Sequence, residues 1–459
     1  LKNCCISQNH NNMSLSETQI LALAPDSSSA KSGKDLAASV AKWKNMGSND
    51  LAIWGECQGS GKDAYKTQID VQNTAFKCSC PSRKFPCKHG IGLYLLFVRQ
   101  QSLFSEQQTP EWVSEWIKKR NEKASNTATK ESEPVSAEKS EKQSKDKEKR
   151  AAQRTSKVAN GMAEVDLLLR DWVRAGLLSL QSKSPSYWQE KAAHLVDAQA
   201  NGVANILLAL RDINYAASDW QSQCLYHINR LHLLSNAYRN IDHLPPLLQQ
   251  DVRQIIGWTL KKEEILSDDN TLQVTDTWLV AAKVMEEIPE QKLTVQYLWL
   301  YGQDSQKYAL LLDFATPYSP ITNLFVPQTA PKMTLAFYPS ITPLRALVNG
   351  NAESEVFAKP THFYENFTDM GDYFSQQLQQ NPFFDNAPFW LSQVCLVPHQ
   401  DKWFLFDQNG LYIPIHSKFS AAYQLLAISG AAPCNLFALY YQQQLIPLGI
   451  WSDEQYLIL

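Results

Sequence analysis

Three cysteines and one histidine lie within twelve residues of this chain, at Cys78, Cys80, Cys87 and His89. Their spacing is C-x-C, a six-residue gap, and then C-x-H. Zinc prefers four ligands in a tetrahedron, and three thiolates with one imidazole are a common set. Only nine cysteines and nine histidines occur in 459 residues, so this clustering is far from an even scatter. The pattern predicts one zinc ion bound by these four side chains.

The same ligand count predicts a structural rather than a catalytic metal. Four protein ligands fill the tetrahedron, and no position is left for the water that a catalytic zinc needs. Two alternatives remain at the sequence level: a reduced cysteine cluster without metal, and a disulfide formed in oxidised protein. We expect the zinc to contribute directly to folding, because the predicted core around it is small.

The loop between the two ligand pairs is basic and carries an aromatic residue. Basic groups next to aromatic rings can contact phosphates and stack on bases, so this loop is a candidate contact surface for a partner. The alternative is that the phenylalanine packs against the small core and the lysines are only solvated. The candidate contact residues are Lys77, Arg83, Lys84, Phe85 and Lys88.

The C-x-C and C-x-H pairs resemble the signature of the SWIM zinc finger. Further stretches, at residues 54–62, 80–89, 194–200 and 276–279, are similar to bacterial SWIM zinc finger family proteins. The resemblance covers nearly the whole chain from about Met13. It implies one structural Zn2+, a DNA-binding or protein-binding role, and no catalytic residues. Bacterial members are commonly encoded beside MoxR-like AAA+ ATPases and proteins with von Willebrand factor A (VWA) domains, which implies an adaptor for such partners.

Composition places the chain among globular proteins with two or three cores. The longest apolar stretch, residues 91–98, is far too short to cross a bilayer, so we expect no membrane association. No signal-peptide pattern is visible, and the cysteines are odd in number and mostly scattered, which indicates a reducing compartment. We therefore predict a cytoplasmic location. Residues 1–12 show no periodicity, and Met13 is a plausible start of the native chain.

Charge is distributed unevenly along the chain. Residues 1–157 carry 25 basic and 17 acidic side chains, a net charge of +8, whereas residues 158–459 carry 18 and 29, a net charge of −11. The segment 118–157 holds 13 of the basic and 7 of the acidic residues and has almost no large apolar residue. Such a segment buries too little surface to offset its ordering entropy, which predicts a disordered charged linker. Alternatives are a nucleic-acid-binding arm and a transient charged helix over 136–157.

Periodicity predicts an α+β multidomain fold. Residues 13–117 are expected to form an N-terminal helix, at 26–44, followed by a SWIM module. The strands of that module are expected at 51–57, 64–71 and 75–79, and its helix at 87–101. This is a small zinc-knuckle ββ(β)α module. The predicted domains are the N-terminal module at 13–117 with its finger core at 64–101, the disordered linker at 118–157, an antiparallel helical domain at 158–267, and a β-rich C-terminal domain at 268–459.

Two hairpins are expected near the C-terminus. The dipeptide Asn409-Gly410 lies between two apolar runs and predicts a type I′ turn, in which both residues have positive φ. Segments 436–441 and 445–451 predict another strand pair, and short helices are expected near 365–378.

The function that these observations favour is a zinc-binding, non-enzymatic adaptor for protein partners. A DNA-binding protein that uses the basic loop is the alternative. The opposed charge of the two halves predicts that nucleic acid is bound weakly and without sequence preference. An enzyme whose site lies in the C-terminal domain is a third hypothesis, and a pocket with converging ionisable groups would favour it.

Overall fold

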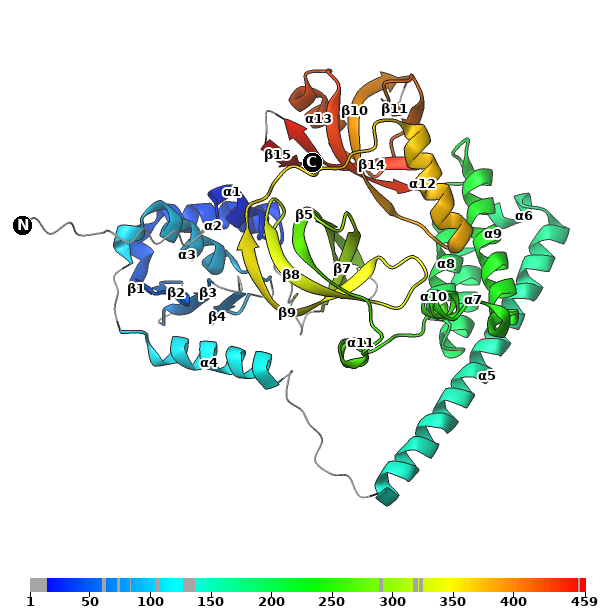
Figure 1. Ribbon diagram of the computed structural model, residues 1–459, viewed down its shortest axis with the longest axis horizontal. Helices are drawn as coiled ribbons and strands as arrows, with labels where there is room; N and C mark the ends of the chain where they lie inside the picture. The colour runs from blue at the N-terminus through cyan, green and yellow to red at the C-terminus, as the bar shows by residue number, and fades with distance from the viewer. Residues whose placement is uncertain are drawn as a thin grey trace, which may run out of the picture.

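The computed structural model describes residues 15–59, 63–71, 75–82, 84–104, 108–126, 137–288, 292–316, 321, 325–400, 402–452 and 455–459. Over these residues the chain forms an N-terminal module, a helical domain, a β-barrel and a C-terminal sheet, in that order (Figure 1). The architecture confirms the predicted mixture of α and β domains. Met13 and Arg83 lie outside the described residues.

The N-terminal module is an antiparallel sheet in the order β1-β2-β3-β4. Ile53 and Cys57 of the sheet share a core with Ile91 and Leu95 of helix α3. The module consists of α1 (Glu17–Ala22), α2 (Ser27–Ala38), β1 (Trp43–Ser48), β2 (Ala52–Cys57), β3 (Tyr65–Asp70), β4 (Ala75–Cys78), α3 (Lys88–Arg99) and α4 (Glu111–Asn126).

One strand of this sheet was not expected from the sequence. The helix predicted over 26–44 ends at Ala38, and Trp43 begins β1 instead of lying on a helical face. The Trp43 indole explains the change, because it is buried beneath α2 and donates a hydrogen bond to the Leu36 carbonyl at 3.0 Å. The predicted cap is present, since the Asp26 carboxylate accepts from the Ser29 amide at 2.7 Å.

The second face of the sheet is covered by α4. Ala52 and Trp54 of β2 alternate with Ile53, so they point to the opposite face, where they pack against Val113 and Ile117 of α4. Arg120 extends this contact through an ion pair with the buried Asp70 carboxylate at 3.1 Å. Both faces of the finger sheet are therefore buried within the chain.

The structure differs from the disordered linker predicted over 118–157. Helix α4 continues to Asn126, and α5 (Ala137–Ala175) begins well before the predicted helical domain; residues 127–136 lie outside the described residues. The C-terminal part of the segment is helical because it packs. The Arg154 guanidinium lies 4.7 Å from the centre of the Trp258 ring and donates to the Gly257 carbonyl at 2.9 Å.

Apolar residues at helical spacing form the core of the predicted helical domain. Val165 and Leu169 of α5 meet Leu207 of α8 and Ile228 and Leu231 of α9 in one core. Its helices after α5 are α6 (Leu178–Gln181), α7 (Pro185–Asp197), α8 (Asn201–Arg211), α9 (Trp220–Arg239), α10 (Pro246–Ile256) and α11 (Lys262–Ser267).

The next part of the chain closes into a barrel in the strand order β5-β6-β7-β9-β8, with β8 pairing back onto β5. Trp278, Leu298 and Phe337 pack together in one of its cores. The seam between β7 and β9 is short and parallel, pairing Leu310 with Arg345 and Leu311 with Ala346. The strands are β5 (Gln273–Ile288), β6 (Leu293–Gly302), β7 (Tyr308–Ala315), β8 (Ala330–Phe337) and β9 (Arg345–Glu355).

A second sheet forms the C-terminal part, in the order β12-β11-β10-β13-β14-β15. It packs on the barrel through a shared aromatic core that includes Trp299, Trp390 and Phe437. The sheet curls, because the His416 amide donates to the Leu445 carbonyl at 2.9 Å and brings the end of β12 beside β14. Its elements are α12 (Phe367–Gln380), β10 (Ala387–His399), β11 (Lys402–Phe406), β12 (Tyr412–Pro414), α13 (Ala422–Ser429), β13 (Cys434–Tyr441), β14 (Gln444–Ser452) and β15 (Gln455–Ile458).

The predicted hairpins form, but the Asn-Gly turn has another geometry. Of its two residues only Gly410 has a positive φ, at 78°, so the turn is not type I′. The buried Asp407 carboxylate sets the turn by accepting from the amides of Asn409 and Leu411, both at 2.9 Å. A side-chain acceptor inside the turn has therefore replaced the expected backbone geometry.

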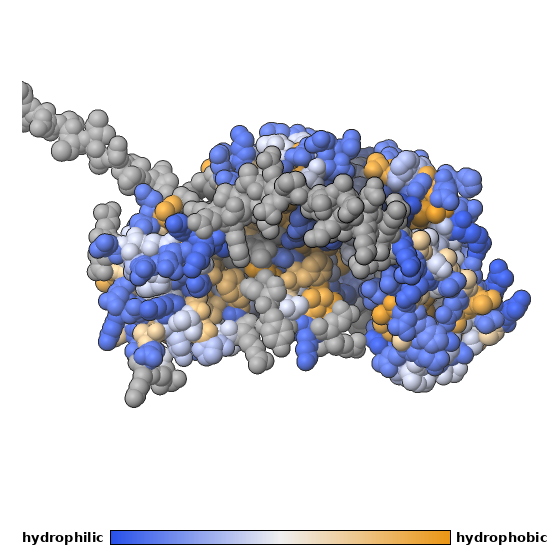
Figure 2. All heavy atoms as spheres, turned by 90° about the horizontal axis from the view of Figure 1, so that it is seen from below, coloured by the Kyte–Doolittle hydropathy of each residue, from blue (hydrophilic) through white to orange (hydrophobic). Residues whose placement is uncertain are grey.

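The parts of the chain contact one another. In the N-terminal module, Gln19 donates to the Gln328 carbonyl at 3.3 Å, and Val326 is buried in the module's core. On the face shown in Figure 2, hydrophilic residues predominate and apolar residues form smaller patches between them. None of the helices that the structure describes is a candidate for crossing a bilayer.

Candidate metal centre

The four predicted ligands are brought together where β4 ends and α3 begins. Cys78 is the last residue of β4, and Cys80 follows two positions later. Cys87 is the N-cap of α3, and His89 lies in the first turn of that helix. A strand end and a helix start thus each supply one pair, as the C-x-C and C-x-H spacing predicted.

The ligand atoms have the separation that a tetrahedral zinc requires. One ligand atom from each of the four side chains lies within 4.8 Å of all the others. The Nδ1 atom of His89 is 3.8 Å from the Cys78 sulfur and 3.9 Å from the Cys87 sulfur. Zinc bonds of about 2.3 Å to sulfur and about 2.0 Å to nitrogen place a sulfur and a nitrogen about 3.5 Å apart at a tetrahedral angle. The donor set and its spacing fit one structural Zn2+ held by Cys78, Cys80, Cys87 and His89.

The side chains of the cluster also shift one another's pKa values. Hydrogen bonds from the Cys78 and Cys87 thiols hold the pKa of Cys80 well below its usual range. Hydrogen bonds with Cys78 and Cys80, together with burial, raise the pKa of Cys87. Burial lowers the pKa of His89, but contacts with Cys78 and Cys80 outweigh burial and raise it to about 9. Cys80, Cys87 and His89 thus perturb one another's protonation, and metal binding would release their remaining protons.

Neighbouring side chains hold the ligands in position. The Tyr65 ring lies 5.0 Å from the His89 ring, and the Thr67 hydroxyl lies 3.2 Å from the Cys78 sulfur. Both residues are on β3, beside the strand that delivers Cys78. Groups of this kind orient metal ligands and tune their basicity. The sequence alone did not indicate them, because nothing in their local pattern separates them from other strand residues.

Cys57 lies in the same module but outside the ligand group. It is fully buried in the core between the sheet and α3, and burial raises the pKa of its thiol to about 11. It therefore serves as a small core residue.

The predicted contact residues have different surroundings. Lys77 and Lys88 are exposed, whereas Arg83 lies outside the described residues. The Lys84 ammonium lies 2.6 Å from the Asp26 carboxylate, at the N-cap of α2. Phe85 is half-buried, 6.5 Å from the Phe76 ring in an edge-to-face arrangement, as the packing alternative predicted.

Comparison with protein families identifies two regions of the chain. Residues 67–96 match the SWIM zinc finger, and residues 153–256 match the SWIM-associated four-helix bundle domain. Comparisons with curated proteins and with solved structures gave no match. The first match contains all four ligands, and the second begins within α5 and runs to the end of α10. The chain therefore contains a region that matches the SWIM zinc finger, followed by a region that matches the four-helix bundle domain associated with it.

Proposed function

We propose that this protein is a non-enzymatic adaptor of the reducing cytoplasm, in which the zinc finger is a scaffold that binds a protein partner through its exposed edge. The main observation behind the proposal is that two side chains of the loop between the two ligand pairs contact other parts of the chain. Lys84 is engaged by Asp26 and Phe85 packs against Phe76, so two groups that would contact phosphates and bases are occupied inside the chain.

The remaining surface of the finger supports the same function. Helices α3 and α4 bury the two faces of the sheet, so a partner would reach the sheet at an edge, and β4 forms the edge beside the metal. Lys77 and Lys88 are exposed there and give that edge a positive charge. The family resemblance suggests a MoxR-like AAA+ ATPase or a VWA-domain protein as the partner. An acidic surface on that partner would complement the two lysines.

Nucleic-acid binding is the second candidate, since residues 1–157 carry a net charge of +8. The net charge of −11 on residues 158–459 opposes it at long range. We therefore expect dissociation constants of about 1 µM or weaker for DNA at physiological salt.

The test measures the binding of candidate protein partners and of DNA to the same variants. Purified MoxR-like and VWA-domain proteins from the same genome, and single- and double-stranded DNA, are titrated into the full-length protein at about 50 and about 200 mM salt. Reversing the charge at Lys77 and Lys88 together should weaken protein binding by about tenfold. Lys262→Glu, an exposed lysine on α11, is the matched control and should change nothing.

Tight DNA binding that persists at the higher salt and disappears in the Lys77→Glu/Lys88→Glu variant would reverse this ordering of partners. DNA binding that the higher salt abolishes would mean that the positive charge attracts phosphates without a dedicated site.

A further inference from the structure

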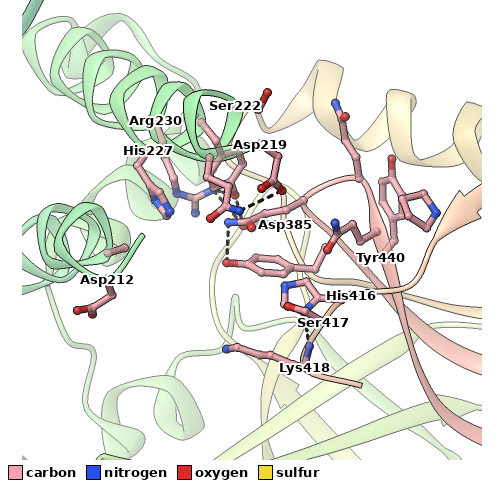
Figure 3. A pocket seen from close by; sticks show the side chains of 18 of the residues that line it. Asp212, Asp219, Ser222, His227, Arg230, Asp385, His416, Ser417, Lys418 and Tyr440 are labelled. Carbon is pink, nitrogen blue, oxygen red and sulfur yellow. Dashed lines mark hydrogen bonds and ion pairs between the residues drawn. The ribbon is translucent and has the colours of Figure 1, made fainter. Parts of the chain in front are cut away.

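A cleft of about 2190 Å³ lies where the helical domain, the barrel and the C-terminal sheet meet. Figure 3 shows that Asp219, Ser222 and Arg230 of the helical domain face His416 and Tyr440 of the C-terminal part across this space. The outer face of strands β5 to β7 contributes a third wall, which includes Tyr297 and Phe314. Pockets for small ligands usually measure about 300 to 1,000 Å³, so this cleft has the size for a polymer segment.

The charge of the cleft argues against a nucleic acid. Its walls carry equal numbers of acidic and basic residues, namely Asp212, Asp219, Glu286 and Asp385 against Arg211, Arg230, Lys402 and Lys418. Arg230 pairs with Asp385 at 3.3 Å, and Arg211 pairs with Asp212 at 2.7 Å. The cleft therefore has no excess of positive charge, which a phosphate backbone would require.

Amide and aromatic side chains dominate the remaining wall. Gln442, Gln443 and Gln444 follow one another in the lining, which also includes Trp403 and Tyr440. A carboxamide has both donors and an acceptor, which are the groups that pair with a peptide bond. Aromatic side chains are enriched in the buried centres of protein interfaces. This combination is suited to an uncharged polypeptide with apolar side chains.

The glutamine turn has a backbone that its sequence does not favour. Tyr441 and Gln444 pair across a two-residue turn in which Gln442 has φ 49° and Gln443 has φ 61°. Residues with a Cβ atom rarely adopt this left-handed region, and Asn-Gly is the usual choice for such a turn. The turn therefore places three consecutive carboxamides in the lining of the cleft with a backbone that Asn-Gly would adopt more readily.

We propose that the cleft binds an extended, uncharged segment of a partner polypeptide, with the Gln442–Gln444 turn hydrogen-bonding to its backbone. The aromatic rings of the cleft would pack against its apolar side chains. This inference rests on the proposed role as a protein-binding adaptor, and it assigns that protein a second site, remote from the zinc finger.

The probe is a phage-displayed library of linear dodecapeptides, selected on the full-length zinc-loaded protein, followed by titration of the synthetic peptides. We expect enrichment of uncharged peptides with aromatic or aliphatic residues. The double variant Gln442→Asn/Gln443→Gly should bind them about tenfold more weakly and should at the same time melt at a higher temperature, because the turn is relieved. Ser222→Trp, which fills the cleft from α9, should also weaken binding by about tenfold.

Gln306→Gly is the matched control. Gln306 is an exposed left-handed glutamine, with φ 55°, in the turn between β6 and β7, outside the cleft. This variant should raise the melting temperature and leave peptide affinity unchanged.

Failure to enrich any peptide would overturn the proposal, as would peptides that bind every cleft variant equally well. Peptides lost only in the Lys77→Glu/Lys88→Glu variant would overturn the cleft as their site while supporting the proposed adaptor function at the finger. Binding of neutral oligosaccharides in place of peptides would assign the cleft to glycans instead.

Discussion

At the scale of single residues, Cys87 connects the metal to the fold. Its sulfur belongs to the ligand group, and its backbone caps α3. Cys87→Ser should therefore reduce zinc from about one ion per chain to almost none and unfold the N-terminal module, because three ligands do not close the site. Elemental analysis with circular dichroism checks both results. Cys57→Ala, at a buried thiol outside the group, should retain the zinc; full zinc content in Cys87→Ser would contradict the ligand assignment.

The sequence predicted the ligands but not their neighbours. Spacing alone identifies Cys78 to His89, because two short-range pairs restrict where a strand end and a helix start can place their side chains. The partner of Lys84 could not be predicted in this way. Asp26 lies in a different element, and only the packing of α2 beside the knuckle brings the two charges together.

At the scale of elements, Asp407 connects a hairpin to a helix. Its buried carboxylate accepts from the Asn409 and Leu411 amides in the β11–β12 turn and from the Phe367 amide at the start of α12, at 2.8 Å. Asp407→Ala leaves these donors without their acceptor and should reduce the free energy of unfolding by about 2 to 4 kcal/mol.

Denaturant unfolding measures the change. Asp304→Ala, at an exposed turn residue, is the control and should be within about 0.5 kcal/mol of the wild type. Equal stabilities of the two variants would mean that Asp407 does not connect these elements.

Elements with strong periodicity were predictable, whereas the turns between them were not. The apolar stripes of α8 and α9 and the strand pair β13–β14 follow from side-chain spacing. The Asn409-Gly410 dipeptide failed as a type I′ signal because the Asp407 side chain competes for the turn amides. Gln442-Gln443 adopts positive φ without any sequence signal. Helix α4 was recognisable in principle, since Trp112, Val113, Trp116 and Ile117 repeat at helical spacing.

At the scale of the whole molecule, zinc removal should separate the finger from the rest. The zinc site holds β4 against α3, whereas the four-helix bundle has a core of its own. A chelator should therefore abolish hydrogen-exchange protection in residues 43–99 and preserve it in α7 to α10. Loss of protection in both regions together would show that contacts such as Gln19 with Gln328 couple the domains into one unfolding unit.

The arrangement of the domains was beyond sequence reasoning. The barrel closes through the pairing of β5 with β8 and through the short seam between β7 and β9. Side-chain periodicity predicts a strand, but it does not predict which strand it pairs with. The cleft combines residues of α8 and α9 with others from the barrel and the C-terminal sheet. Its residues have no common motif, so only the three-dimensional structure brings them into one site.

The position of α4 has a consequence for how the protein is made. The finger motif is complete at residue 96, but Trp54 stays uncovered until Val113 and Ile117 have been synthesised. During translation, a chain that ends at the motif would present an apolar sheet face to solvent and to other nascent chains. The smallest fragment suitable for expression of this zinc finger therefore extends through α4, to Asn126, rather than to the boundary of the motif.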